Sequence, residues 1–356
     1  MRSDGWLNGE RISYAATDKA LTNLKQQPET EWLNEVSSVP LQQSLRDLQT
    51  AYTNFFEKRS GYPSFKKKLG RQSVNYTQRG FRFDAKTRTL KLAKIGRIKV
   101  KWSRNSIPEP SSIRVIRSAA GKFYVSLVVE AEPITRPKTG EVVGIDFGVS
   151  RLATLDNGEL IPNPKYGSKH QTRLALEQRR LERKKKGSNR REIQRKRVAK
   201  VHEKVTSSRQ DALHKFSSAI VKRFDTIYVE DLNLRGMVKN HTLARSLSDA
   251  SIGTAIRLLT EKAEQSGKQV VKIDRWFPSS KTCSNCGHVV DQLPLSVREW
   301  TCVECGVRHD RDVNAAINIL AVGQTVTARG GSVRRARATA RERTIRRSEN
   351  LQSVNQ

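Results

Sequence analysis

The stretch from Val142 to Gly148, VVGIDFG, decides the fold, because it reads as a buried β-strand that ends in an acid between glycines. Buried strands seldom carry an acid, since burying an unpaired carboxylate costs free energy. The glycines would let a metal ion or a ligand approach the backbone. Thr154 and Leu155 then suggest the second strand of a hairpin. A turn aspartate after a core strand is also common, so this pattern alone leaves both interpretations of Asp146 open.

A second apolar run ends in acids in the same way. The stretch TIYVEDL over 226–232 is rich in β-forming residues and reaches Glu230 after a predicted helix over 210–223. The order strand, helix, strand is typical of a sheet whose strand ends gather at one site. We therefore expect Glu230 to lie near Asp146.

The third acidic segment is HDRDVNAAINI over 309–319, where Asp310 and Asp312 stand just before or in the first turn of a predicted helix. Either carboxylate would suit a helix N-cap, a purely structural role. Helix geometry alone does not separate the two.

Three acids at the ends of separate elements make a specific chemical hypothesis in so basic a protein. Carboxylate oxygens are the ligands of Mg²⁺ or Mn²⁺. Two such ions about 4 Å apart can activate water and stabilise the leaving oxygen of a phosphodiester. No phosphate-binding loop competes, because Gly144 and Gly148 are not followed by the Lys-Ser/Thr pair that such a loop requires.

The four cysteines of the chain form two Cys-x-x-Cys pairs, separated by fifteen residues: Cys283, Cys286, Cys302 and Cys305. This spacing is typical of a zinc ribbon. Gly287 and Gly306 follow the two pairs and allow the tight turns that point all four thiolates at one ion. Four thiolates complete the coordination of zinc, so we predict a structural zinc ion. Candidate nucleic-acid contacts on the ribbon are Lys281, His288, Arg298, Trp300 and Arg308.

The charge of the chain indicates a polyanionic partner. It has 67 Lys and Arg residues against 35 Asp and Glu, a net charge of +32, which favours nucleic acid. We expect no membrane partner, because no apolar run approaches the length of a membrane span, and no signal peptide is evident. The predicted location is the prokaryotic cytoplasm, in association with the nucleoid.

The pattern along the chain predicts an α+β multidomain protein. An apolar stripe over 41–55 predicts a core-facing helix, and short alternating runs over 81–129 predict a small barrel or sandwich. Between 169 and 204, 15 Lys and Arg residues against 4 Glu, with a break at Gly187, predict a basic helical hairpin that tracks a nucleic-acid backbone. The predicted boundaries are 1–65 helical, 66–138 a β-barrel, 139–320 the α/β domain with hairpin 169–206 and zinc ribbon 278–308, and 321–356 a flexible basic tail.

With these motifs in this order, the chain resembles the TnpB family, the OrfB-type proteins of bacterial insertion sequences, which are related to compact type V CRISPR nucleases. The likeness covers nearly the whole chain. The stretches that carry it are GIDFG at 144–148, VEDLNL at 229–234, SKTCSNCG at 280–287, DRDVNAA at 310–316 and PSFKKK at 63–68.

The resemblance implies an RNA-guided DNA endonuclease with an RNase H-like (RuvC) core and a guide RNA from the transposon end. In such systems base pairing reads the sequence while the protein reads backbone shape. By the family pattern the third catalytic acid is Asp312, giving the site Asp146, Glu230 and Asp312. Segment 1–65 would be a recognition lobe and 66–138 a wedge domain. The family usually begins with a further strand and helix, so we expect an N-terminally truncated lobe.

Three other functions remain open on the sequence. A non-cleaving nucleic-acid-binding protein or repressor would use the same fold without the chemistry. A DNA-strand-joining transposase would use a similar trio of acids. An interaction scaffold with a structural zinc would leave the acids at strand ends unexplained.

Overall fold

The computed structural model describes residues 5, 8–9, 12–65, 72–130, 132, 136–239 and 241–328. The chain divides into two compact units, one formed by Met1–Glu132 with Arg180–Lys200 and the other by Pro133–Arg179 with Val201–Gln356. The flexible tail predicted over 321–356 is wrong for its first residues, because 321–328 belong to a helix that begins at Arg311. The rest of that predicted tail and the lysine run at 66–68 lie outside the described residues.

The first unit begins with helices. They are α2 (Tyr14–Leu24), the 3-10 helix η1 (Pro28–Asn34) and α3 (Ser38–Phe56). The Ser13 hydroxyl accepts a hydrogen bond from the Ala16 amide and starts α2. The apolar stripe of α3 was predicted to face the core. Only part of it is buried, because Tyr52 is buried while Leu48 is 36% exposed.

The strands of the first unit form two open sheets, and the predicted closed β-barrel over 66–138 is wrong. One sheet has the order β1-β5-β6 and the other β2-β3-β4, with antiparallel pairing throughout. One apolar cluster contains residues of both sheets, among them Tyr76, Leu90 and Ile113. Two short sheets that share a core satisfy the apolar pattern without closure, as in a sandwich. The strands are β1 (Gln72–Thr77), β2 (Phe81–Asp84), β3 (Thr89–Leu92), β4 (Gly96–Ile98), β5 (Pro110–Arg117) and β6 (Phe123–Val129).

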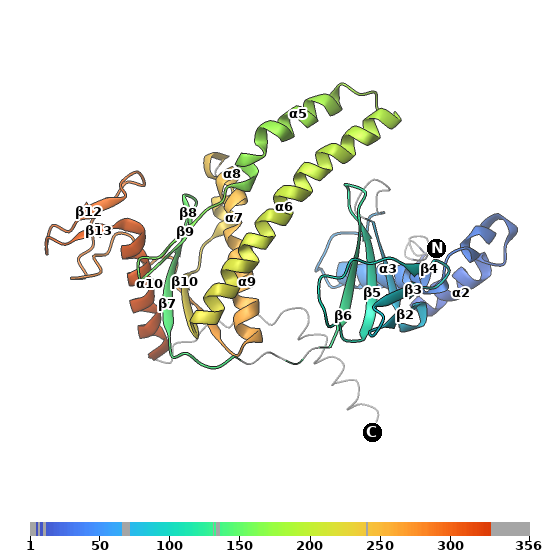
Figure 1. Cartoon of the computed structure of the whole chain (residues 1–356), viewed down its shortest axis with the longest axis horizontal. Coiled ribbons are helices and arrows are strands. Elements are labelled where there is room, and N and C mark those ends of the chain that lie inside the picture. The colour runs from blue at the N-terminus through green and yellow to red at the C-terminus, as the bar shows by residue number, and fades with distance from the viewer. Residues whose placement is uncertain are drawn as a thin grey trace. The chain divides into compact units, whose positions relative to one another are not determined.

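A pair of long helices forms the basic segment. Helix α5 (Gln171–Glu182) and helix α6 (Asn189–Arg223) lie side by side (Figure 1), and Gly187 between them has a φ of +83°. The Arg191 guanidinium donates to the carbonyls of Leu181 and Lys184, which lie at the end of α5 and just beyond it. These bonds satisfy carbonyls that have no partner within the helix and hold the turn.

The second unit is built on a five-stranded sheet with the order β11-β10-β7-β8-β9. Strands β7, β10 and β11 are parallel, and β8 and β9 are antiparallel to their neighbours. The hairpin expected after Asp146 is confirmed by the pairing of β7 with β8. The strands are β7 (Val142–Phe147), β8 (Arg151–Leu155), β9 (Leu160–Pro162), β10 (Thr226–Glu230) and β11 (Gln269–Ile273).

Helices cover both faces of this sheet (Figure 1). Side chains of α6 and α9 pack with Val143, Ile145 and Val229 in the largest apolar cluster. On the other face, α10 packs its Ile319 with Tyr228 and Ile273. The remaining elements are α4 (Tyr166–Lys169), α7 (Leu234–Met237), α8 (His241–Ala250), α9 (Ile252–Gln265), β12 (Glu299–Thr301), β13 (Arg308–Asp310) and α10 (Arg311–Ala328). Among the described helices, none has the length and apolar character needed to cross a membrane.

Candidate active site and cysteine cluster

Asp146 and Glu230 extend from adjacent parallel strands on the same face of the sheet. Ile145 of β7 lies opposite Val229 of β10, so the two acids follow at neighbouring positions. Ile145 and Val229 are buried against α6 and α9. Because side chains alternate along a strand, the acids face the other side, which α10 covers. Both acids are partly buried.

Gly144 lets α10 approach β7 closely. A Cβ atom there would lie 2.3 Å from the Ala316 carbonyl oxygen and 2.8 Å from the Leu320 Cβ, so no side chain fits. Asp312 lies one helical turn before Ala316, on the same side of α10. The next residue of β7 on this face is Asp146. The packing therefore brings Asp312 toward Asp146, and its charge acts on Asp146 together with that of Glu230.

Asp310 and Asp312 have different roles in the structure. The Asp310 carboxylate accepts hydrogen bonds from the backbone amides of Asp312 and Val313, at 2.9 and 3.0 Å, and so caps α10. Asp312 lies within the first turn of α10, and its side chain is 18% exposed. The capping role therefore belongs to Asp310 and not to Asp312.

Two arginines approach Asp312. The guanidinium of Arg298 lies 3.3 Å from its carboxylate, and that of Arg151 lies 3.8 Å away. Arg151 also lies 3.4 Å from Asp310. Both arginines therefore form ion pairs with the Asp312 carboxylate.

The pKa values of the two strand acids are raised. Burial, followed by the charges of Asp312 and Glu230, raises the pKa of Asp146 to about 8. Burial and then the charge of Asp231 raise the pKa of Glu230. Asp231 itself is paired with Lys272 and Arg275, and hydrogen bonds from these two side chains keep its pKa below the ordinary value despite some burial. Crowded, partly desolvated carboxylates of this kind need a cation nearby to be ionised together.

The donor set of the three acids fits a divalent metal ion, although the carboxylates are not gathered around a single point. Within the described residues, the four cysteines form a group that could hold a metal ion as it stands, and the three acids do not form such a group. Hard cations prefer carboxylate oxygens, which is what this edge of the sheet offers.

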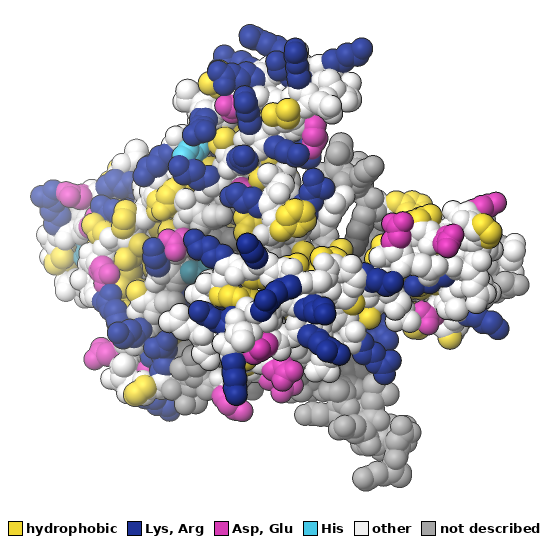
Figure 2. All heavy atoms as spheres, turned by 45° about the vertical axis from the view of Figure 1, so that its right-hand side comes forward, with side chains coloured by type: hydrophobic (Ala, Val, Ile, Leu, Met, Phe, Trp, Pro, Cys, Tyr) yellow, Lys and Arg dark blue, Asp and Glu magenta, His cyan; other side chains and the backbone are white. Residues whose placement is uncertain are grey.

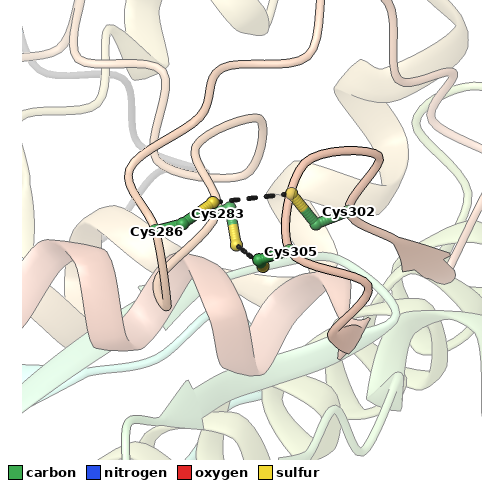
Figure 3. A group of neighbouring side chains, drawn as sticks. All are labelled: Cys283, Cys286, Cys302 and Cys305. Atoms are coloured by element: carbon green, nitrogen blue, oxygen red, sulfur yellow. Dashed lines mark hydrogen bonds between the residues drawn. The ribbon is translucent and has the colours of Figure 1, made fainter.

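The four predicted zinc ligands come together in one cluster (Figure 3). Their sulfur atoms lie within 4.8 Å of one another. The Sγ atoms of Cys283 and Cys305 are 3.6 Å apart, as are those of Cys286 and Cys302. Sulfurs about 2.3 Å from a tetrahedral zinc ion would be separated by about 3.8 Å. The spacing and the chemistry of the donors therefore fit one tetrahedral ion.

Groups around the cluster shift the pKa values of two of the thiols in opposite directions. Hydrogen bonds from the Val307 backbone amide and then from the Asn285 side chain lower the pKa of the Cys305 thiol to about 6. A backbone hydrogen bond from His288 also lowers the pKa of Cys286, but desolvation and the neighbouring thiols outweigh it and raise that pKa to about 12. Buried His309 places its Nε2 atom 3.1 Å from the Cys283 sulfur.

Two asparagines tie the cysteine segment to α10. The side chain of Asn314 accepts a hydrogen bond from the Ser284 amide and donates to the Thr282 carbonyl at 2.7 Å. Asn318 donates to the carbonyls of Ser279 and Thr282, at 2.8 and 2.6 Å. Both asparagines are buried. The first Cys-x-x-Cys turn is thus bonded to the helix that carries Asp312.

The aromatic residue predicted as a nucleic-acid contact on the ribbon is not accessible. Trp300 is 8% exposed and packs against His309, with ring centroids 4.9 Å apart. Trp276, which the sequence reasoning did not single out, is 83% exposed. Its position just after β11 was the available signal, but β11 itself was not predicted.

The helical hairpin carries the densest positive charge. Figure 2 shows Lys and Arg side chains crowded at the top of the view, where α5 and α6 project. A cavity of about 400 Å³ lies at its turn. Its basic lining residues are Arg180, Arg183, Lys184, Arg190 and Arg197. Such a cluster suits phosphate groups.

Two protein-family models match the chain. The model OrfB_IS605, described as "Probable transposase", matches residues 126–241, and the model of the Cas12f1-like TNB domain matches residues 253–319. A protein of Streptomyces pristinaespiralis named "Putative RNA-guided DNA endonuclease" is 46% identical over 346 residues, covering 96% of this chain and 85% of that protein. InsQ of Escherichia coli K12, with the same description, is 34% identical, covering 94% of this chain and 86% of that protein.

A solved structure has a similar fold. The Cas12f1 chain in a cryo-EM structure of a complex with sgRNA and target DNA superposes with a TM-score of 0.55 at 14% sequence identity. The match covers 89% of this chain and 77% of that chain. The likeness establishes a mixed α/β fold of the same kind.

Proposed function

The chain belongs to the OrfB (TnpB) family, and we propose that it is a transposon-associated, RNA-guided DNA endonuclease that hydrolyses phosphodiester bonds at Asp146, Glu230 and Asp312. Its relatives from Streptomyces pristinaespiralis and Escherichia coli are named as RNA-guided DNA endonucleases and align over nearly its full length.

One observation carries the proposal: three acids from separate elements lie at one edge of the sheet. Asp146 and Glu230 come from neighbouring parallel strands, and Asp312 comes from the helix that packs on Gly144. The strand order supports an RNase H-like (RuvC) core. When the strands β7 to β11 are numbered 1 to 5 in chain order, their order in the sheet is 3-2-1-4-5. Neighbours among strands 1 to 3 are antiparallel, and strands 4 and 5 are parallel to strand 1.

The roles of the acids follow from their surroundings. Bound Mg²⁺ or Mn²⁺ ions would supply an activated water and stabilise the leaving oxygen of the phosphodiester. Asp146, whose pKa is raised by the charges of both other acids, would be one carboxylate ligand of the metal. Glu230, from the adjacent strand β10, and Asp312, from α10, would supply the remaining carboxylate ligands.

We assign zinc to Cys283, Cys286, Cys302 and Cys305 in a structural role. Four thiolates leave no open position for water. Because Asn314 and Asn318 bond this segment to α10, the zinc ribbon would hold the helix that carries Asp312.

The partners proposed are DNA and a guide RNA derived from the transposon end. The net charge of +32 suits both. The helical segment 1–65 and the two small sheets of 66–138 would hold RNA and the flanking DNA, with the hairpin 169–206 along the phosphate backbone. Association with the nucleoid would follow from the same charge.

A non-cleaving DNA-binding protein is the second candidate. The observation that favours it is the pairing of Asp312 with Arg298 and Arg151, since these cations would compete with a metal ion for the carboxylate. A strand-joining transposase has no separate structural feature in its favour.

The test is to express the chain with its flanking genomic DNA, purify it and sequence the RNA that co-purifies. The proposal expects one discrete RNA that maps to the end of the element. Random cellular RNA would contradict guided cleavage, and a discrete RNA without Mg²⁺-dependent cleavage of matching DNA would favour the second candidate.

A further inference from the structure

Trp276 presents its ring to solvent from a segment whose neighbours are fixed. Its side chain is 83% exposed. On one side, Arg275 forms an ion pair with Asp231. On the other side, Phe277 packs in the apolar cluster beneath α10. The Trp276 amide also donates to the Asp274 carboxylate at 3.0 Å. The ring therefore projects from a braced backbone.

This segment connects two of the elements that carry the acids. It leaves β11 at Ile273, the register partner of Glu230. It then reaches Ser279, whose carbonyl accepts a hydrogen bond from Asn318 on α10. Trp276 thus lies between the strand beside Glu230 and the helix of Asp312.

A single exposed apolar side chain is normal on a protein surface and by itself indicates nothing. Trp276 differs in its surroundings, because it follows Arg275, which contacts Asp231 together with Lys272 of β11. Both cationic side chains remain partly exposed. A nucleotide combines a flat base, which can stack on an aromatic ring, with a negatively charged phosphate. This combination matches an exposed indole beside cations.

We propose that Trp276 is a stacking site for an unpaired base of single-stranded DNA next to the cleavage site. The inference rests on the proposed function, because it assigns Trp276 to the strand that the acids would cut. Stacking would fix the base, while Lys272 and Arg275 would lie near the phosphate of the same nucleotide. The backbone would then be held in register with Asp146 and Glu230.

The test uses the full chain with Asp146→Asn, which cannot complete cleavage, and needs neither metal nor guide. Binding of a labelled oligothymidylate is compared with binding of an abasic oligonucleotide of equal length. Trp276→Ala should weaken binding of the oligothymidylate at least about fivefold, and Trp276→Phe should weaken it less. Binding of the abasic strand should not change. Trp32→Ala is the matched control, because Trp32 is also exposed, at 59%.

A local measurement complements the affinities. An oligonucleotide carrying 5-iodouracil should photo-crosslink to Trp276, as mapped by mass spectrometry. The proposal fails if Trp276→Ala binds both strands like the parent, or weakens both equally. It also fails if the dependence on Trp276 appears only with oligouridylate, which would assign the site to RNA. Because binding is measured without cleavage, these results are independent of whether the parent chain cuts DNA.

Discussion

At the scale of single residues, Asp146 is the acid whose protonation depends most on the fold. Its pKa of about 8 lies above the value of about 3.9 expected in the unfolded chain. Between these values the metal-free folded chain holds a proton that the unfolded chain has lost. The contribution of Asp146 to the free energy of unfolding therefore falls as the pH rises from about 4 to about 8.

Replacing Asp146 with Asn should remove this dependence. The metal-free variant should melt at a higher temperature than the wild type at pH 8, and the difference should shrink at pH 5. Thermal melts in a chelator at both pH values measure it. Asp211→Asn, at an exposed position, is the control and should show no such trend. A constant difference at both pH values would mean that the carboxylate of Asp146 is ionised without metal.

The residue scale also shows where a sequence stops being informative. The pattern around 310–312 allowed either aspartate to cap the helix. The amide bonds to Asp310 show which one caps α10, and they depend on where α10 begins. A sequence pattern fixes a helix start only to within a residue or two. The contacts of Arg151 and Arg298 with Asp312 could not be predicted from the sequence either, because the two arginines lie far apart along the chain.

At the scale of secondary-structure elements, the contact between α10 and β7 aligns Asp312 with Asp146. Gly144→Ala would force a Cβ against the Ala316 carbonyl oxygen. Overpacking against backbone should destabilise the protein by about 1–3 kcal/mol, and it should reduce cleavage by displacing Asp312. Denaturant unfolding and a cleavage assay measure the two effects. Gly61→Ala, which meets nothing within 4 Å, is the control, and an equal loss in both variants would contradict this role of Gly144.

The cysteine segment and α10 should loosen together. Removing zinc with a chelator should increase hydrogen exchange in 278–308 and in the first turns of α10. Asn314→Ala should produce part of the same change with zinc bound, because it breaks the bonds to Ser284 and Thr282. Gln324→Ala, on the exposed side of α10, is the control. Unchanged exchange in α10 after chelation would show that the ribbon does not support the helix.

The elements that the sequence predicted were those with strong patterns. The strands that end in Asp146 and Glu230 are apolar runs with a clear boundary. Strand β1, QSVNYT, was missed because it is mostly polar and exposed, and pairs with β5 through its backbone. The barrel was wrong for a related reason. Alternation shows that a strand has a buried face, but it does not show which strands close a sheet.

At the scale of the whole molecule, the net charge of +32 makes binding of nucleic acid an ion-exchange process. Affinity should fall by on the order of a thousandfold or more between 50 and 200 mM salt if about 6–10 phosphates are neutralised. Filter binding or anisotropy over a salt series measures the slope. Replacing Arg180, Arg183 and Arg190 at the cavity of the hairpin should make it shallower. A flat salt response of the wild type would contradict backbone tracking.

The central claim is that Asp146, Glu230 and Asp312 form one metal-dependent site that cuts guide-matched DNA. Its most direct test is single-turnover cleavage by the RNA-bound protein, comparing the wild type with Asp146→Asn, Glu230→Gln and Asp312→Asn. We predict cleavage by the wild type with Mg²⁺ and none with a chelator. Each variant should lose cleavage while binding RNA and DNA with nearly unchanged affinity. Cleavage that persists in any of the three variants, or that is lost only together with binding, would contradict the account.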